Sequence, residues 1–257
     1  MVEPTTDAAG VKSAERTLDV LELLARASEP MTFTRIATAL SVPKSSLHKL
    51  LATLERRGWV ETDEMTRSRY RVGMRALQAG TSYVDADEIV QWAETALTTL
   101  TEHFGEASHL GRLDGSDVIY LAKRESAHPL RMFSAVGRRL PAHATAMGKA
   151  MLATMAWEDV ERLVGPHLET LTQKTITSME RLADELALTR ERGYGVDDEE
   201  SADLMRAVAV ALPSVDSTCN AISVSAPVVR MPLDRTPDVA AAIAQAISSS
   251  IPPAPRR

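Results

Sequence analysis

A leucine stripe in residues 41–58 constrains the fold of this chain more than any other feature of its sequence. The segment reads SVPKSSLHKLLATLERRG, and its leucines recur at spacings of three and four residues, as on one face of an α-helix: Leu47, Leu50, Leu51 and Leu54. Ser41 and Pro43 favour the start of a helix, and Gly58 favours its end. The opposite face at the N-terminal end is small, polar and basic, with Lys44, Ser45, Ser46, His48 and Lys49.

Two further helices and a hairpin are predicted around this helix. Apolar residues at helical spacing indicate one helix from Ser13 to a point before Pro30, and another from residue 32 or 34 to Leu40. After Gly58, WVETD and SRYRVG are typical of two short strands, with their turn at residues 64–67. Three helices followed by a hairpin predict a winged helix-turn-helix domain over residues 13–73.

Such a domain suggests a nucleic-acid partner. A helix with small polar and basic residues at its N-terminal end fits a DNA major groove, while its leucines hold it against the other helices. We therefore expect the polar face of the helix to contact bases and phosphates, and arginines on the second helix and the hairpin to contact the backbone. The candidates are Arg35, Lys44, Ser45, Ser46, His48, Lys49, Arg67 and Arg69. The alternative is a small helical domain whose charges are simply solvated.

The charge distribution is consistent with a DNA-binding N-terminal domain joined to a second domain of opposite net charge. The whole chain has a net charge of −6, but residues 11–75 hold 12 Lys and Arg against 8 Asp and Glu. Residues 76–257 hold 17 basic against 25 acidic side chains. A positive N-terminal part joined to an acidic remainder is typical of a DNA-binding module fused to a second domain.

The rest of the chain predicts an α+β organisation. We expect a disordered arm at 1–12, linker and dimerisation helices at 74–104 with a break near 85–87, a C-terminal domain at 105–251 and a frayed tail at 252–257. The turn Asp114-Gly115 between two apolar runs predicts a hairpin. Further strands are predicted at 130–137, 206–212 and 220–227, and helices at 143–155, 179–192 and 236–249. A mixed sheet with helices on its faces would combine them.

Several classes of protein lack support in this sequence. No apolar run approaches 18 residues and no basic-then-apolar leader is present, so we expect a cytoplasmic protein with no membrane partner. The histidines are scattered and Cys219 is the single cysteine, so no metal site or cofactor is expected. The rival class is a hydrolase-like enzyme with a Ser/His/Asp arrangement drawn from residues such as His143, Asp197 and Cys219, but no G-x-S-x-G motif supports it.

Four blocks, in order, resemble the IclR family of bacterial transcriptional regulators: PKSSLHKLLATLERRGWV, GRRLPAHATAMGKAMLA, RGYGVDDEE and ISVSAP. The resemblance runs from about Ser13 to Ser249. It implies an N-terminal winged helix-turn-helix bound to double-stranded operator DNA and a C-terminal, GAF-like effector-binding domain. It also implies a homodimer or homotetramer, small organic acids or aromatic catabolites as effectors, and a repressor more often than an activator.

The chain departs from the family pattern at four places. Leu204 stands where many members have Gly, and Ala207 stands where sensors of small acids often have Cys. The Pro frequent in the next strand is missing near Val210, and the wing turn EMTRS lacks a Gly. Loss of the thiol, together with Met132, Met147 and Met205, favours a roomier apolar pocket for an aromatic or amphipathic acid. Plain core packing of these methionines is the alternative.

The resemblance also implies an effector site. By position, the amides of Ala146 and Met147 would meet a carboxylate, and a helix N-terminus favours an anion. Ser223 and Ser225 lie two residues apart on a predicted strand, so their hydroxyls share one face and could bind a ligand or the backbone. The remaining candidates are Asp197 and Ala207, whereas Asp198, Glu199 and Glu200 are expected to form a solvated acidic turn.

Overall fold

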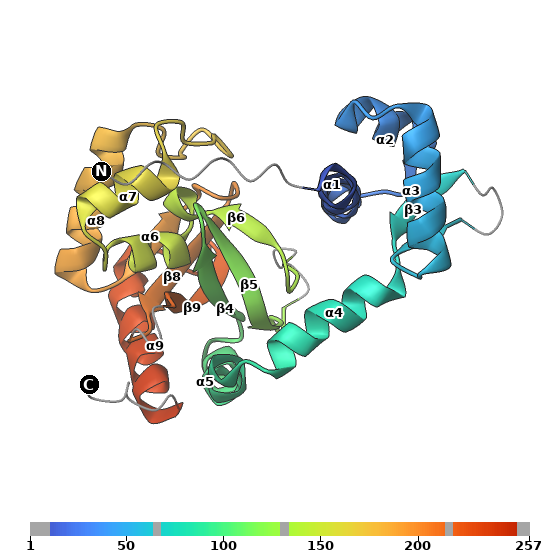
Figure 1. Ribbon diagram of the computed structural model, residues 1–257. Coiled ribbons are helices and arrows are strands. Elements are labelled where there is room, and N and C mark those ends of the chain that lie inside the picture. The colour runs from blue at the N-terminus through green and yellow to red at the C-terminus, as the bar shows by residue number, and fades with distance from the viewer. Residues whose placement is uncertain (1–10, 64–67, 129–133, 214–217, 251–257) are drawn as a thin grey trace, which may run out of the picture. The chain divides into compact units, whose positions relative to one another are not determined.

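The computed structural model describes residues 11–63, 68–128, 134–213 and 218–250, and Figure 1 shows the elements they form. The chain divides into two compact units, residues 1–86 and 87–257. The division falls where the sequence predicts a break in the linker helices. The wing turn with Arg67, the first ten residues and the C-terminal tail from 251 lie outside the described residues.

The N-terminal unit is a winged helix-turn-helix domain, as predicted. Its elements, in order, are α1 (Lys12–Arg26), β1 (Met31–Thr32), α2 (Phe33–Leu40), α3 (Lys44–Arg56), β2 (Val60–Thr62), β3 (Arg69–Val72) and α4 (Met74–Asp85). The short β1, which the sequence did not predict, pairs with β3 and makes a three-stranded sheet of order β1-β3-β2. The leucine stripe packs into the core: Leu47, Leu51 and Leu54 are buried beside Val20 and Ile36.

Ser41 has a different role from the one predicted for it. It ends α2 rather than starting α3: its φ is +51°, in the left-handed region, and its amide donates to carbonyls in the last turn of α2. Pro43 is the residue before α3, as expected. Gly58, with φ +74°, ends the turn that follows α3.

The C-terminal unit is built on one six-stranded sheet of order β6-β5-β4-β9-β8-β7. Its strands are β4 (Ala107–Asp114), β5 (Asp117–Arg124), β6 (Arg139–Pro141), β7 (Gly195–Asp198), β8 (Met205–Ala211) and β9 (Asn220–Pro227). Every pairing between these strands is antiparallel, so the prediction of a mixed sheet is wrong. All eight residues of β9 are buried, because helices cover both faces of the sheet.

The two faces of the sheet carry different helices. α5 (Glu88–Phe104) and α9 (Thr236–Ser250) pack together, α5 on β4 and α9 on β8. Ser108 of β4 points to this face, since its hydroxyl donates to the carbonyl of Leu97 in α5. Neighbouring strand residues point to the opposite face, where α6 (Ala146–Leu152) packs on β7, β8 and β9. α7 (Trp157–Val164) and α8 (Met179–Arg192) complete this GAF-like unit (Figure 1).

Several predicted boundaries hold, and others shift for identifiable reasons. α8 has Ser178 as its N-cap and ends at Gly193, as predicted. Ser134–Gly137 forms no strand, and the rest of the strand predicted at 130–137 lies outside the described residues. The helix predicted at 143–155 is shorter, because Ala142–Ala144 is a 3-10 turn and the Thr145 hydroxyl caps α6 by accepting from the amide of Gly148. α7 and β7 were not predicted.

Candidate functional site

The first candidate site is the polar face of α3. Lys44, Ser45, His48 and Lys49 are exposed and Ser46 is half-buried, so the structure brings these five residues onto one accessible turn and a half of helix. The imidazole of His48 stacks on the ring of Phe33 from α2, with centroids 4.3 Å apart. Arg35 on α2 and Arg69 on β3 are also exposed.

The N-terminus of α3 is open to an anion. Pro43 precedes the helix and no side chain of the described residues caps it. The first amides of a helix have no partner within the helix, and its dipole places partial positive charge at this end. Together with Lys44 and Lys49, this end can bind a phosphate.

The second candidate site is a cavity in the C-terminal unit, between the N-terminus of α6 and the sheet. It holds about 270 Å³ of empty space, counting the solvent at its mouth. All six residues predicted for the effector site line it: Ala146, Met147, Asp197, Ala207, Ser223 and Ser225. Four further lining residues were not predicted: His109, Tyr120, Thr145 and Ser201.

Two glycines position α6 against the sheet. A Cβ at Gly148 would lie 2.1 Å from the carbonyl oxygen of Ala142, and a Cβ at Gly195 would lie 2.2 Å from that of Ala146. Neither approach is sterically possible for another residue. The motif HATAMGKA therefore brings the first amides of α6 to the cavity through close backbone packing on the 3-10 turn and on β7.

The strand register places the polar residues of the cavity in two rows. Asp197, Ala207 and Ser225 are directly paired across β7, β8 and β9, and Ser223 is paired with His109 of β4. Directly paired residues of neighbouring strands project to the same face. The hydroxyl of Ser225 is buried and has no hydrogen-bond partner among the described residues. It is therefore available to a ligand.

His109 and Tyr120 form a second polar wall of the cavity. The ring of Tyr120 meets the imidazole edge-on, with centroids 5.1 Å apart. Burial, with the positive charge of Lys123, lowers the pKa of His109 to about 4, and burial raises the pKa of Tyr120 to about 12. Both side chains are therefore neutral at pH 7. The alternation of EASHLGRL puts His109 on one face of a strand, but the sequence does not show which strand lies beside it.

Asp197 lines the cavity but uses its carboxylate in a turn. Oδ1 accepts from the amides of Glu200 at 2.8 Å and Ser201 at 3.2 Å, and Oδ2 accepts from the Ser201 hydroxyl at 2.5 Å. Burial raises its pKa, and these hydrogen bonds oppose the rise. Asp197 therefore shapes the edge of the cavity.

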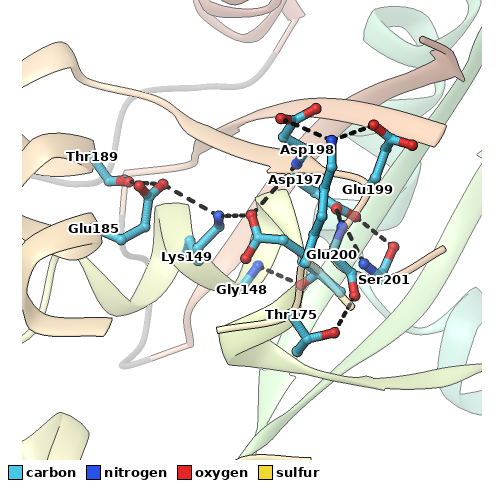
Figure 2. A network of polar contacts seen from close by, with 12 residues as sticks. Gly148, Lys149, Thr175, Glu185, Thr189, Asp197, Asp198, Glu199, Glu200 and Ser201 are labelled. Atoms are coloured by element: carbon cyan, nitrogen blue, oxygen red, sulfur yellow. Dashed lines mark hydrogen bonds and ion pairs between the residues drawn. The ribbon is translucent and has the colours of Figure 1, made fainter. Parts of the chain in front are cut away.

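The prediction of a solvated acidic turn is wrong for Glu200, because this residue is buried. Lys149 of α6, with only 1% of its side chain exposed, forms ion pairs with Glu200 and, at 3.2 Å, with Glu185 of α8. Figure 2 shows the ammonium group of Lys149 between these two carboxylates. Burial raises the pKa of Glu200, and the charge of Lys149 opposes the rise. Because Lys149 follows Met147 by two residues, this network joins α6, α8 and the Asp197 turn behind the cavity.

The residues of the rival enzyme hypothesis are not arranged as a catalytic triad. His143 bonds through Nε2 to the carbonyl of Glu169 at 3.0 Å, and Asp197 is held in its turn. His109 does contact a serine, Ser134, but its Nδ1 meets no carboxylate among the described residues. Among the described residues, no group of three or more His, Cys, Asp or Glu side chains could hold a metal ion. None of the described helices is long and apolar enough to cross a membrane.

Comparisons with known proteins match both units. The model of the IclR helix-turn-helix domain matches residues 13–64, and that of the bacterial transcriptional regulator IclR C-terminal domain matches residues 81–251. The HTH-type transcriptional regulator XynR of Escherichia coli is 37% identical over 201 residues, 78% of this chain and 79% of its own length. The transcriptional repressor IclR of the same organism is 32% identical, over 92% of this chain and 87% of its own. A crystal structure of an IclR regulator from Alicyclobacillus acidocaldarius superposes with a TM-score of 0.79 at 26% identity, covering 94% of this chain and 96% of its own.

Proposed function

The chain belongs to the IclR family of bacterial transcriptional regulators, and on that premise we propose that it is a repressor whose operator binding changes when a small organic acid enters the cavity of the C-terminal unit. The observation that carries the proposal is the cavity itself: the N-terminus of α6, two serines and Met147 meet there. A regulator that binds operator DNA works where the DNA is, so we place it in the cytoplasm.

In this proposal α3 enters the major groove of double-stranded DNA. Lys44, Ser45, Ser46, His48 and Lys49 contact base edges and phosphates, while Arg35, Arg67 and Arg69 contact the backbone beside them. Two subunits would place their α3 helices in half-sites about 34–36 Å apart on one face of the duplex.

Exposed apolar residues on α4 support a second copy of the chain as partner. All twelve residues of α4 are described and none of them is buried. Met74, Leu77 and Tyr83 are among the most exposed large apolar residues of the described chain. Apolar side chains at helical spacing favour burial against a matching helix. We therefore propose that α4 is a dimerisation helix in a homodimer or a homotetramer.

The effector that fits best is a carboxylic acid with one ring or a short chain. Its carboxylate would accept from the amides of Ala146 and Met147 and from the free hydroxyl of Ser225. Because the 270 Å³ counts the solvent at its mouth, the cavity is small. The side chain of Met147 and the small Ala207 leave an adaptable apolar wall for the body of an aromatic or amphipathic acid. No cofactor is needed for such a switch.

Binding of the full chain to its own upstream intergenic DNA tests the proposal. Affinity is measured across a salt series, with and without a panel of aromatic and short aliphatic acids. Sequence-selective binding that one acid weakens is the expected result. Selective binding that no acid changes would remove the effector role of the cavity but keep the regulator. Absence of selective binding would overturn the proposed role of α3.

A further inference from the structure

Building on the proposed function, in which α3 contacts DNA and α4 joins two copies of the chain, we infer that Gly73 and Glu61 are positioning residues for operator binding. They fix the direction in which α4 leaves the winged domain, and this direction sets the separation of the two α3 helices in the dimer. The operator property that they determine is the spacing between half-sites, not the sequence of a half-site.

Two consecutive residues after α3, Gly58 and Trp59, are hydrogen-bonded to the last turns of that helix. The amide of Gly58 donates to the carbonyl of Glu55 at 2.9 Å, and the amide of Trp59 donates to the carbonyl of Leu54 at 2.9 Å. The backbone of both residues is therefore fixed to the end of the proposed recognition helix.

The carbonyls of the same two residues accept hydrogen bonds from the start of α4. The amide of Gly73 donates to the carbonyl of Trp59 at 2.8 Å, and the amide of Arg75 donates to the carbonyl of Gly58 at 3.0 Å. Gly58 and Trp59 thus bond to α3 through their amides and to α4 through their carbonyls. The two helices are joined by main-chain hydrogen bonds on both sides of one short segment.

Glu61 of β2 completes this junction with its side chain. Its Oε1 accepts from the amide of Met74 at 3.2 Å, and its Oε2 accepts from Nε and Nη2 of Arg71, its cross-strand neighbour on β3. The amide of Ala76 donates to the carbonyl of Gly73 at 3.1 Å. The amides at the N-terminus of a helix have no partner within the helix, and here each of the first four has found one.

Gly73 is required because the chain segments approach closely at the junction. A Cβ at this position would lie 2.5 Å from the carbonyl oxygen of Gly58 and 3.0 Å from the carbonyl carbon of Trp59. Both neighbours are backbone atoms, so they cannot rotate away as a flexible side chain could. Any other residue at position 73 must therefore move the start of α4 relative to the end of α3.

A small change at this junction is amplified along α4. The helix runs without interruption for twelve residues, which corresponds to a length of about 18 Å (Figure 1). A rotation of about 10° at its start moves its far end by about 3 Å over that length. In a dimer held together through α4, the same rotation changes the separation of the two α3 helices.

The separation matters because a dimer gains affinity only where both α3 helices can bind at once. Two linked binding modules lose this gain when their geometry does not match the spacing of their sites. Two extra base pairs between the half-sites move the second one by about 7 Å and turn it by about 70° around the duplex axis. A rigid junction between α3 and α4 cannot follow such a change.

Operator duplexes of different spacing test the inference with the full chain. The operator in the upstream intergenic DNA is located by footprinting and is prepared with its natural spacing, with two base pairs added, with two removed, and as a single half-site. Fluorescence anisotropy measures the affinity for each duplex. We expect the wild type to prefer the natural spacing over both altered spacings by about tenfold or more.

Variants of the junction should reduce this preference without weakening binding to the single half-site. Gly73→Ala should lower the preference to about threefold or less, because α4 leaves the domain in another direction. Glu61→Ala should have a smaller effect, since this side chain is 39% exposed, and Glu61→Gln, which keeps an oxygen acceptor, should stay closer to the wild type. Gly80→Ala, with open space around its Cβ, and Glu29→Ala, at an exposed turn, are the matched controls.

The outcomes distinguish this inference from the proposed function. Equal affinity of the wild type for the three spacings, or a Gly73→Ala variant with the full preference, would overturn the inference and leave the regulator intact. An equal loss of affinity for the natural operator and the single half-site would also overturn it, because that pattern indicates general destabilisation. A wild type without selective binding to any duplex would instead overturn the proposed role of α3.

Two further measurements complete the test. Light scattering of each variant reports whether the dimer persists, and a monomeric wild type would overturn both the dimerisation role of α4 and this inference. If Gly73→Ala does not fold, the wild-type spacing series and the difference between Glu61→Ala and Glu61→Gln decide the result. Identical spacing preferences in the wild type and both Glu61 variants would exclude Glu61 as a positioning residue.

Discussion

The carboxylate of Asp87 and the guanidinium of Arg112 form a largely buried ion pair, with Oδ2 and Nη1 2.5 Å apart. Asp87 is the first residue of the C-terminal unit and the N-cap of α5, where its Oδ1 accepts from the amide of Ile89. Arg112 lies on β4 and also donates through Nε to Asn220 of β9 at 2.8 Å. The start of α5 is thus tied to the two central strands whose other face lines the cavity.

Asp87→Asn should uncouple effector binding from DNA binding. Without the ion pair, the start of α5 no longer follows β4 and β9, so we expect ligand affinity to persist while its effect on operator affinity shrinks. We also expect a loss of roughly 3 kcal/mol in the free energy of unfolding, because a largely buried ion pair is broken. Glu88→Gln, at the exposed next residue, is the control. An unchanged ligand effect on operator affinity would contradict the coupling role of the pair.

Lys49→Ala should weaken binding to all DNA sequences alike. A lysine that neutralises one phosphate releases about one counterion, so its loss should flatten the slope of log affinity against log salt by about one unit. Arg181→Ala removes the same charge from α8 of the other unit and should leave the slope unchanged. Fluorescence anisotropy across a salt series measures both. If the slope of the Lys49 variant equals that of the wild type, Lys49 does not contact a phosphate.

His109 should make the C-terminal unit sensitive to acid. Its pKa falls from an ordinary 6.5 to about 4 on folding, so the stabilisation is complete above pH 6.5 and is lost as pH falls through 4. The total is roughly 3 kcal/mol. Burial raises the pKa values of Asp197 and Glu200, so their protonation as the pH falls stabilises the folded state. Their contribution therefore opposes that of His109.

A comparison of variants isolates the histidine from these carboxyl groups. Between pH 7 and pH 4, the free energy of unfolding should fall less in His109→Gln than in the wild type, by up to roughly 3 kcal/mol. His167→Gln should follow the wild-type curve. Urea denaturation at each pH measures the difference, and parallel curves for the wild type and His109→Gln would exclude a buried neutral imidazole.

Lys149→Met should destabilise the C-terminal unit far more than loss of a surface lysine. The change leaves Glu200 and Glu185 without their shared cation in a buried place, which costs about 3–5 kcal/mol. Lys174, paired with Glu199 of the same turn but exposed, is the matched control, and Lys174→Met should change little. Replacing Glu200 by Leu in the Lys149→Met variant should recover part of the loss. Equal effects of the two lysine variants would contradict the burial of Lys149.

Gly148→Ala and Gly80→Ala should change the stability of the protein in opposite directions. A Cβ at Gly148 meets backbone of Ala142 at 2.1 Å, so α6 must move and stability falls by about 1–3 kcal/mol. A Cβ at Gly80 in α4 meets nothing within 4 Å, and alanine there should add about 1 kcal/mol through helix propensity. Chemical denaturation of both variants measures these changes in stability. The effect of organic acids on operator binding is measured for Gly148→Ala as well. A neutral Gly148→Ala would show that α6 does not need this close approach.

Sequence patterns were sufficient wherever the determining contacts are local. The leucine spacing of α3, the Ser178 cap and Gly193 end of α8, and the Asp114-Gly115 hairpin all depend on residues within a few positions of one another. The shared face of Ser223 and Ser225 follows from the two-residue period of a strand. The family resemblance supplied six predicted effector-site residues, and the structure brings all six to one cavity.

Long-range partners could not be predicted in this way. Lys149 and Glu200 are separated by 51 positions, and nothing local to GVDDEE shows that one of its carboxylates turns inward to a buried ammonium. His109 enters the cavity only because β4 pairs with β9, more than a hundred residues later. A single sequence carries no signal for such pairings, and the order of strands in the sheet was unpredictable for the same reason.

The absence of buried residues along α4 has a thermodynamic consequence. A twelve-residue helix with no buried residue is marginal in water, because its hydrogen bonds barely offset the entropy of ordering the chain. Its helix–coil equilibrium therefore depends on what covers it. If a second copy provides that cover, helicity of α4 and subunit association become a single event, and the melting temperature of this segment rises with protein concentration.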